Sequence, residues 1–315
     1  MLKRFYLKNR MNMIIIVFIT LFALLFPYLV TMTHLKKSQM KIYEPEPYEK
    51  YVIVSGNGEN EKMDIEMFIP LVLYSIMPQD YDEETMKTMI VIIRTYIVYK
   101  INEQNNGSDS IRNENLGLPY TTYSELEKKW GKKYESKYNK TMKLIEETNK
   151  EVIYYQGEPI YPYYHELSAG MTNPGEYEYL KSVASEADTE ADDYMKILYF
   201  TPDSMIEKLN TKMNDSLAID NLNDMITLHL KENSEYVDSV DVGTEHISAE
   251  EWQKLFEIPS TAFTFEKFAD GYKMVSKGKG CGKGLSIYGA GKMAEEGKTY
   301  KEILGYYYTG VDVHD

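Results

Sequence analysis

The amino-acid sequence predicts a single mixed α+β globular domain behind an N-terminal transmembrane helix, and three observations lead to this prediction. Residues 13–32 are almost all apolar. Beyond residue 63, helix-type and strand-type segments alternate without a regular βαβ period, which is typical of an α+β domain. Five glycines fall within residues 278–289, where the backbone must bend sharply or lie against something large, because only glycine adopts positive φ without penalty.

The N-terminal region predicts a single-pass anchor in the cell membrane. About 20 apolar residues span a bilayer as a helix, and residues 13–32 have that length. The basic residues before this segment are Lys3, Arg4, Lys8 and Arg10. By the positive-inside rule they place residues 1–12 in the cytoplasm as a short tail and the rest of the chain outside. A cleaved signal peptide is the rival interpretation, but Pro27, Tyr28 and Met32 stand where a small-x-small cleavage site is expected.

Residues 33–62 are predicted to be a juxtamembrane linker, since Pro45 and Pro47 stand there among Glu and Lys. The domain is then expected to cover residues 63–315. The chain's 35 Lys and Arg against 49 Asp and Glu give a net charge of −14, which argues against a nucleic-acid partner. The one cysteine, Cys281, excludes an internal disulfide and multi-cysteine zinc sites, so we expect no metal and no cofactor.

The first half of the domain carries clear helix signals. Asp82 can cap a helix over about residues 83–100, and residues 70–78 ahead of it indicate a short helix ended by proline. One face of the longer helix is apolar: Met86, Met89, Ile90, Ile93 and Ile97. Arg94 within it is expected to pair with carbonyls or a carboxylate. Residues 105–115 indicate a surface loop. Ser124 and Glu127 form a capping-box pattern for a second helix, and a third is expected over residues 136–148.

The second half alternates strands with short helices. Residues 152–155 and 159–164 are predicted as a hairpin joined through Gln156 and Gly157. Residues 203–235 show no clear pattern. A second capping box, from Ser248 to Glu251, precedes a helix over residues 252–256. Strands are expected over 263–268 and 272–276, and helices over 287–295 and 300–307.

The glycine run, residues 278–284, does not fit a phosphate-binding loop. It lacks the Gly-x-x-x-x-Gly-Lys-Ser/Thr pattern, and the dinucleotide fingerprint needs a βαβ unit with an acidic residue downstream. Together with two earlier blocks it resembles something else. The three blocks, in order, are Ser75-Ile76-Met77-Pro78 with Ile93-Arg94-Thr95-Tyr96, then Tyr163-Tyr164-His165-Glu166-Leu167-Ser168-Ala169-Gly170-Met171-Thr172, then residues 258–311 with the glycine run.

These blocks resemble the stage II sporulation protein D family, also called the amidase-enhancer family, over nearly all of the chain beyond residue 63. The members of this family that are characterised as enzymes are peptidoglycan lytic transglycosylases, which is the activity that the resemblance implies. Such enzymes deliver a proton to the glycosidic oxygen as an oxocarbenium-like transition state forms, and a carboxylic acid of raised pKa supplies it. The family's presumed acid is a Glu directly before Met-Pro. Ile76 occupies that position here and has no proton to give.

Other positions of the resemblance concern substrate binding. The residues expected to contact substrate are His165, Ser168, Thr172, Tyr164, Cys281, Ser286 and Tyr288. Against the family pattern, Cys281 replaces a usual His, Ile287 a usual Gln, and Glu166 a usual Ser or Thr. Ala169 stands where Gly is usual. The retained positions are mostly those that a fold needs, which indicates a divergent member or pseudoenzyme.

Two residues could supply a catalytic group in place of the expected Glu. Glu166 is a candidate relocated acid, although strand alternation should point it away from His165. Cys281 could act as a thiolate near His165 if Lys279 and Lys283 lower its pKa, but we favour the interpretation that it is a small residue tolerated in a tight glycine turn. Several tyrosines could stack on sugar rings, although strand propensity and core filling explain most of them equally well: Tyr161, Tyr163, Tyr164 and Tyr306 to Tyr308.

The sequence therefore predicts a membrane-anchored peptidoglycan-binding protein with weak or no glycan cleavage, acting in cell-wall remodelling during sporulation. An active lytic transglycosylase with a relocated acid remains open, and so does a scaffold or activator of a cell-wall amidase. The expected partners are glycan strands, the membrane through residues 13–32, and an amidase or other engulfment proteins.

Overall fold

The computed structural model describes residues 43–56, 59–77, 81–104, 107–212 and 222–315, together with Phe22, Leu25 and Phe26. The predicted tail and nearly all of the predicted membrane-spanning segment lie outside the described residues. Within the described part, no helix has the length and apolar character needed to cross a membrane. Strands and helices are interspersed in one mixed α+β globular domain, as the sequence predicted.

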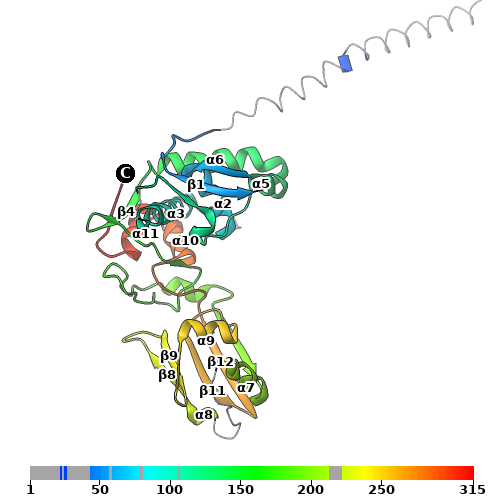
Figure 1. The fold of residues 1–315 in the computed structure, drawn as a ribbon, viewed down its shortest axis with the longest axis vertical. Coiled ribbons are helices and arrows are strands. Elements are labelled where there is room, and N and C mark those ends of the chain that lie inside the picture. The colour runs from blue at the N-terminus through cyan, green and yellow to red at the C-terminus, as the bar shows by residue number, and fades with distance from the viewer. Residues whose placement is uncertain are drawn as a thin grey trace, which may run out of the picture.

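The larger hydrophobic cluster surrounds α3 (Glu83–Glu103), which lies in the middle of the upper part of Figure 1. Helices α2 (Ile65–Ile76), α6 (Tyr134–Glu147), α10 (Ile287–Glu295) and α11 (Tyr300–Tyr307) pack against it. The side chains of Met89, Ile90 and Ile97 are completely buried. The apolar stripe predicted from the sequence is thus the inner side of this helix.

Two small sheets flank this cluster. One has the order β2-β1-β3, built from β1 (Tyr51–Gly56), β2 (Glu59–Asp64) and β3 (Ser110–Arg112). The other has the order β14-β4-β5, built from β4 (Val152–Tyr155), β5 (Glu158–Pro159) and β14 (Asp312–His314). Short elements α4 (Asn113–Leu116), α5 (Tyr123–Trp130) and η1 (Gly131–Lys133) connect the first sheet to α6.

A second hydrophobic cluster forms the lower part of Figure 1. Its first sheet has the order β11-β12-β7, from β7 (Met195–Phe200), β11 (Phe263–Phe268) and β12 (Gly271–Lys277). Its second has the order β10-β9-β8, from β8 (Ile226–Leu230), β9 (Val237–Val242) and β10 (Glu245–Ser248). Helices α7 (Pro202–Asn210), α8 (Leu222–Met225) and α9 (Ala249–Phe256) complete it, and Trp252 of α9 is completely buried.

Most predicted helices and strands are confirmed, with shifts that have physical causes. β1 and β2 lie mainly within residues 33–62, so the ordered part begins earlier than the predicted linker boundary. Helix α2 begins at Ile65 rather than at Pro70, because the Asp64 carboxylate accepts a hydrogen bond from the Glu66 amide. The first capping box uses Thr122 and Glu125 rather than Ser124 and Glu127.

The strand predicted over residues 159–164 is split. β5 pairs with β4, whereas β6 (Tyr164–His165) leaves the hairpin and pairs in parallel with β13 (Leu285–Ser286), directly after the glycine run. The second capping box, from Ser248 to Glu251, is confirmed. The boundaries of β11 are those predicted for residues 263–268.

Arg94 ties three elements of the larger cluster together, which confirms its expected pairing. Its guanidinium binds both carboxylate oxygens of Glu66 at 2.7 and 2.8 Å. It also donates to the Glu151 carbonyl at 3.0 Å and to the Thr148 hydroxyl at 2.9 Å. The side chains of Arg94 and Glu66 are 0% and 2% exposed. Because water does not reach either group, each charge is compensated mainly by the other. Such a bidentate pair fixes α2 against α3 and the end of α6.

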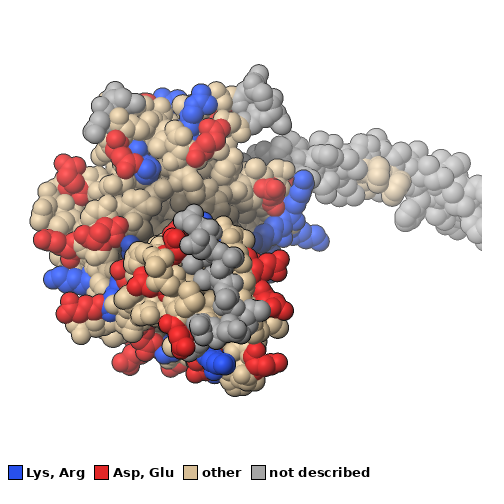
Figure 2. All heavy atoms as spheres, turned by 60° about the horizontal axis from the view of Figure 1, so that its bottom comes forward, with Lys and Arg blue, Asp and Glu red and all other residues tan. Residues whose placement is uncertain are grey.

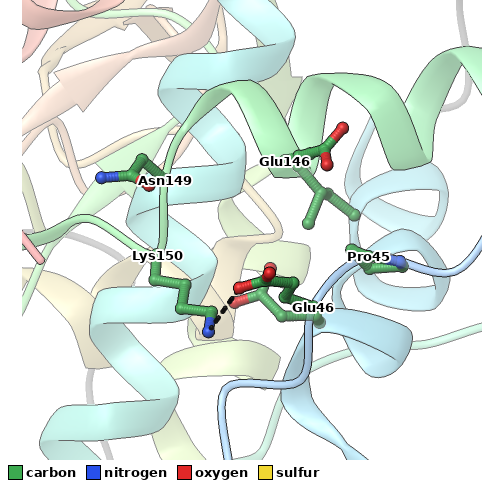
Figure 3. Close-up of a pocket in the computed structure, with 7 residues that line it drawn as sticks. Pro45, Glu46, Glu146, Asn149 and Lys150 are labelled. Atoms are coloured by element: carbon green, nitrogen blue, oxygen red, sulfur yellow. Dashed lines mark ion pairs between the residues drawn. The ribbon is translucent and has the colours of Figure 1, made fainter.

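The extended segment before β1 lies over this ion pair. Figure 3 shows Pro45 and Glu46 beside the last turn of α6, where Lys150 pairs with Glu46 at 3.5 Å. These residues line a pocket of about 220 Å³ that also includes Glu66. The last part of the predicted linker is therefore attached to the domain.

Replacing Glu66 by Gln should lower the free energy of unfolding by about 3–5 kcal/mol, because it leaves a buried guanidinium without its counter-charge. Urea denaturation of the full chain measures it. Asp109→Asn, which removes the half-exposed partner of Lys62, is the control and should change stability little. Equal stability of Glu66→Gln and the wild type would contradict this account of the buried pair.

Candidate functional site

The backbone of the glycine run is hydrogen-bonded to the backbone of the segment that carries His165. The Lys279 amide donates to the Leu167 carbonyl at 2.8 Å, and the Leu167 amide donates back to the Lys279 carbonyl at 3.1 Å. The glycines of this run at positions 278, 280, 282 and 284 all have positive φ and alternate with Lys279, Cys281 and Lys283. The run thus follows a backbone path that ordinary side chains rarely adopt.

Two positions show why glycine is needed. A Cβ added to Gly284 would lie 1.9 Å from the Tyr163 carbonyl oxygen, and one added to Gly282 would lie 2.3 Å from the Tyr236 ring. Both contacts are closer than real Cβ atoms allow. The prediction that this backbone lies against something large is confirmed: it lies against the His165 segment and against Tyr236.

His165 is buried at the centre of this contact. Its Nδ1 lies 3.0 Å from the Lys283 carbonyl, which can only accept, so Nδ1 carries the proton. Nε2 is then an acceptor, and it has no hydrogen-bond partner in the described part of the chain. Burial lowers the pKa of His165 to about 4, so the ring is neutral at physiological pH. The neutral ring donates its Nδ1–H hydrogen bond to Lys283 but does not act as a general acid at this pH.

Asp188 is the residue that sequence reasoning missed. Its buried carboxylate accepts from the Ser168 amide at 2.7 Å and from the Ser286 hydroxyl at 2.8 Å. Burial raises the pKa of Asp188. It lies in η2 (Glu186–Glu190), inside a polar acidic stretch that shows no periodicity. A signal could have come only from tertiary contacts, because its hydrogen-bond partners are distant in sequence.

The serines and the threonine predicted to bind substrate are buried with structural partners. Ser286 caps α10 by accepting from the Gly289 amide at 3.1 Å, besides holding Asp188. Thr172 accepts from the Val183 amide at 2.9 Å and donates to the Lys181 carbonyl. Ser168 is completely buried. Their role in positioning the site is visible, and direct contact with a ligand stays a prediction.

Tyr164, Tyr288 and Cys281 are partly exposed. Burial raises the pKa of the Tyr164 hydroxyl to about 12. Burial also raises the pKa of the Cys281 thiol, and this outweighs the opposing effect of Lys283. The thiolate considered from sequence is therefore disfavoured, because its flanking lysines do not compensate for desolvation.

Glu166 lies on the opposite side of the strand from His165, as alternation predicted: His165 is buried and Glu166 exposed. Its carboxylate pairs with the Lys279 ammonium at 2.7 Å. This ion pair engages the carboxylate that would have to act as the relocated acid. Lys279 also lies 3.8 Å from Asp193, so this edge of the site is a network of compensated charges.

Ile76, where the resemblance led us to expect an acid, is the last residue of α2 and packs against the larger hydrophobic cluster. Pro78, the next proline along the chain, lies outside the described residues. Beside the glycine run, the Glu176 carboxylate accepts a hydrogen bond from the Tyr163 hydroxyl at 2.8 Å and pairs with the Lys283 ammonium at 2.9 Å. In Figure 2, acidic side chains are spread over the visible face among basic ones, without a basic stripe.

Comparison with known proteins agrees with this arrangement. A family model described as "Stage II sporulation protein" matches residues 55–155. The chain is 26% identical to stage II sporulation protein D of Bacillus subtilis over 272 residues, covering 83% of this chain and 77% of that protein. These matches support the resemblance to the stage II sporulation protein D family. The protein of that name from Bacillus amyloliquefaciens is 24% identical over 85% of this chain and 79% of its own length.

A protein of Brachyspira hyodysenteriae is similar at 25% identity, over 85% of this chain and 70% of that protein. The stage II sporulation protein D relatives thus match both hydrophobic clusters rather than the family-model region alone. The resemblance inferred from the three sequence blocks is confirmed at the level of the family.

The buried neutral His165 should make folding stability depend on pH. Its folded pKa of about 4 lies below the unfolded value of about 6.5, so the unfolded chain binds the extra proton between these values. The contribution of neutral His165 to the free energy of unfolding is complete above pH 6.5. It is lost as pH falls toward 4, and the total loss is about 3 kcal/mol. Asp188, with its raised pKa, acts in the opposite direction, so the comparison must be made between variants.

In His165→Asn, an amide nitrogen replaces Nδ1–H toward Lys283 and cannot titrate. The free energy of unfolding, measured from pH 4 to 7, should rise less steeply with pH in this variant than in the wild type. His314→Asn, at the exposed C-terminus, is the matched control and should keep the wild-type slope. Parallel curves for His165→Asn and the wild type would show that His165 is not held neutral.

Proposed function

We propose that this member of the stage II sporulation protein D family is a membrane-anchored peptidoglycan-binding protein with little or no glycan cleavage. It acts in cell-wall remodelling during sporulation. The observation that carries this proposal is the apolar Ile76 at the end of α2, where the family resemblance expects the proton-donating Glu. General acid–base help is worth roughly 10²–10⁴ in rate, and isoleucine supplies none of it.

The carboxylates around the glycine run support the same conclusion. Glu166 pairs with Lys279 and Glu176 with Lys283. Burial raises the pKa of Asp188, but this carboxyl is completely buried and its two oxygens are hydrogen-bonded to Ser168 and Ser286, so a glycosidic oxygen does not reach it. A general acid needs a carboxyl within reach of the glycosidic oxygen and a reason to hold its proton. Glu166 is half exposed and ion-paired, which argues against a relocated acid at that position. Anchoring rests on the apolar segment of residues 13–32.

The test uses the full chain and purified glycan strands from which stem peptides have been removed. We expect co-sedimentation with the strands and no anhydro-sugar ends by mass spectrometry. Ile76→Glu should then gain cleavage, by about 10²-fold or more over background, since it restores an acid at the family position. The control is Ile76→Gln, because glutamine has the size of glutamate but no acidic proton.

Two results would contradict the proposal. Failure of the wild-type chain to bind the strands would remove the binding function. Anhydro-sugar products from the wild type, abolished by Glu166→Gln, would reveal a working enzyme with a relocated acid.

A further inference from the structure

One face of the β7–β12–β11 sheet is open to solvent. The other face packs on α9, where Trp252 and Phe256 contact Phe263 and Phe200. Strand register places on the open side Met195, Ile197 and Tyr199 of β7, Lys273, Val275 and Lys277 of β12, and Thr264, Glu266 and Phe268 of β11. We call these nine residues the outer face.

Large apolar side chains of the outer face are unusually exposed. Tyr199 is 63% exposed, Phe268 50%, Met195 49% and Ile197 48%. Among the described residues they make up a large share of the exposed large hydrophobic side chains, and they lie on strands of one sheet. Clustered exposed apolar groups of this kind mark binding surfaces more often than scattered ones do.

Aromatic rings and charged groups are interleaved on this face. The rings of Tyr199 and Phe268 are in contact, with centroids 5.5 Å apart. The Lys273 ammonium lies 5.4 Å from the centre of the Phe268 ring and pairs with Glu266. Tyr199, Lys273 and Glu266 are direct partners in register across the three strands. The two rings therefore have hydrogen-bonding charged groups beside them.

This mixture fits a saccharide better than a protein. The core of a protein interface is depleted of charged residues, whereas Lys273 and Glu266 lie beside the rings. A pyranose ring presents an apolar C–H face surrounded by hydroxyls, which matches an exposed aromatic ring bordered by hydrogen-bonding groups. The outer face therefore offers sugar rings both kinds of contact.

Continuity with the glycine run and a row of lysine side chains favour one kind of saccharide. Peptide-free peptidoglycan strands carry a carboxylate on every second sugar. Although the chain has a net charge of −14, lysines line β12 at positions 273 and 277, and Lys279 follows in the glycine run. Lys279 contacts Glu166 of the candidate site, and β12 leads into the glycine run without a break. Each of these lysines also pairs with a carboxylate: Lys273 with Glu266, Lys277 with Glu235, and Lys279 with Glu166. The outer face thus adjoins the candidate site, which is the contact of the glycine run with residues 163–172, along a row of ion-paired lysines.

We propose that the outer face is a second glycan-binding surface, which stacks sugar rings of a carboxylate-bearing strand on Tyr199 and Phe268 and extends the path from the candidate site. This inference rests on the proposed glycan-binding function. In this proposal the second hydrophobic cluster contributes to the affinity for glycan strands and takes no part in breaking the glycosidic bond.

The test compares binding of the full chain to purified peptide-free glycan strands. The double variant Tyr199→Ala with Phe268→Ala should weaken binding about tenfold or more, as loss of central aromatic contacts does. Tyr199→Phe with Phe268→Tyr keeps both rings and should retain the wild-type affinity. Leu230→Ala removes a similarly exposed apolar group from β8 and is the matched control. Thermal melting and near-ultraviolet circular dichroism establish that the variants are folded.

The outcomes separate the two proposals. If the wild type binds the strands and the folded double alanine variant binds within about twofold of it, the outer face is not a glycan site and the proposed function stands. If the wild type does not bind, both fail. If the double variant keeps its glycan affinity and loses self-association in sedimentation, the face is a protein interface and the inference is overturned. Should the double variant unfold, Tyr199→Ala alone, at the most exposed ring, decides between the same results.

Discussion

The contact between the glycine run and the His165 segment is made backbone to backbone, with no room for side chains between them. At Gly284 the space is closed by the Tyr163 carbonyl, and at Gly282 by the Tyr236 ring. This contact sets the parallel pairing of β6 with β13 and brings Ser286 to Asp188. It also joins the two hydrophobic clusters, because β12 enters the run from one and β13 leaves it into the other. The positions of His165, Glu166 and Lys279 all follow from it.

Much of the fold was predictable because its signals are local. The apolar stripe of α3, the capping box at Ser248 and the boundaries of β11 depend on residues close in sequence. The close packing of the glycines was predictable too, since closely repeated glycines indicate a backbone path that residues with a Cβ cannot follow. Arg94 was expected to find a carboxylate, although which one was decided by α2.

The rest depended on contacts between distant segments. Asp188 shows no pattern in sequence, and its importance comes from Ser168 and Ser286, each far away along the chain. The same contacts turn two residues expected to bind substrate into buried supports of the site. The split of the strand over residues 159–164 arises because β13 competes with β4 for pairing. The outer face could not be recognised before the register of three strands was known.

The serines and the threonine of the three sequence blocks and the residue at position 76 are held by different contacts. Ser168, Thr172 and Ser286 are held by the folding of the site itself, through Asp188 and backbone partners. The side chain at position 76 is apolar and packs against the larger hydrophobic cluster, so no polar contact of the fold depends on it. On the proposed function, a chain can therefore keep the framework around the glycine run while an apolar residue occupies the position where the resemblance expects the acid. The most direct measurement is a crystal structure of the full chain with a bound peptide-free glycan oligosaccharide. We expect no carboxyl within about 3 Å of a glycosidic oxygen, whereas a desolvated carboxyl in that position would contradict the account.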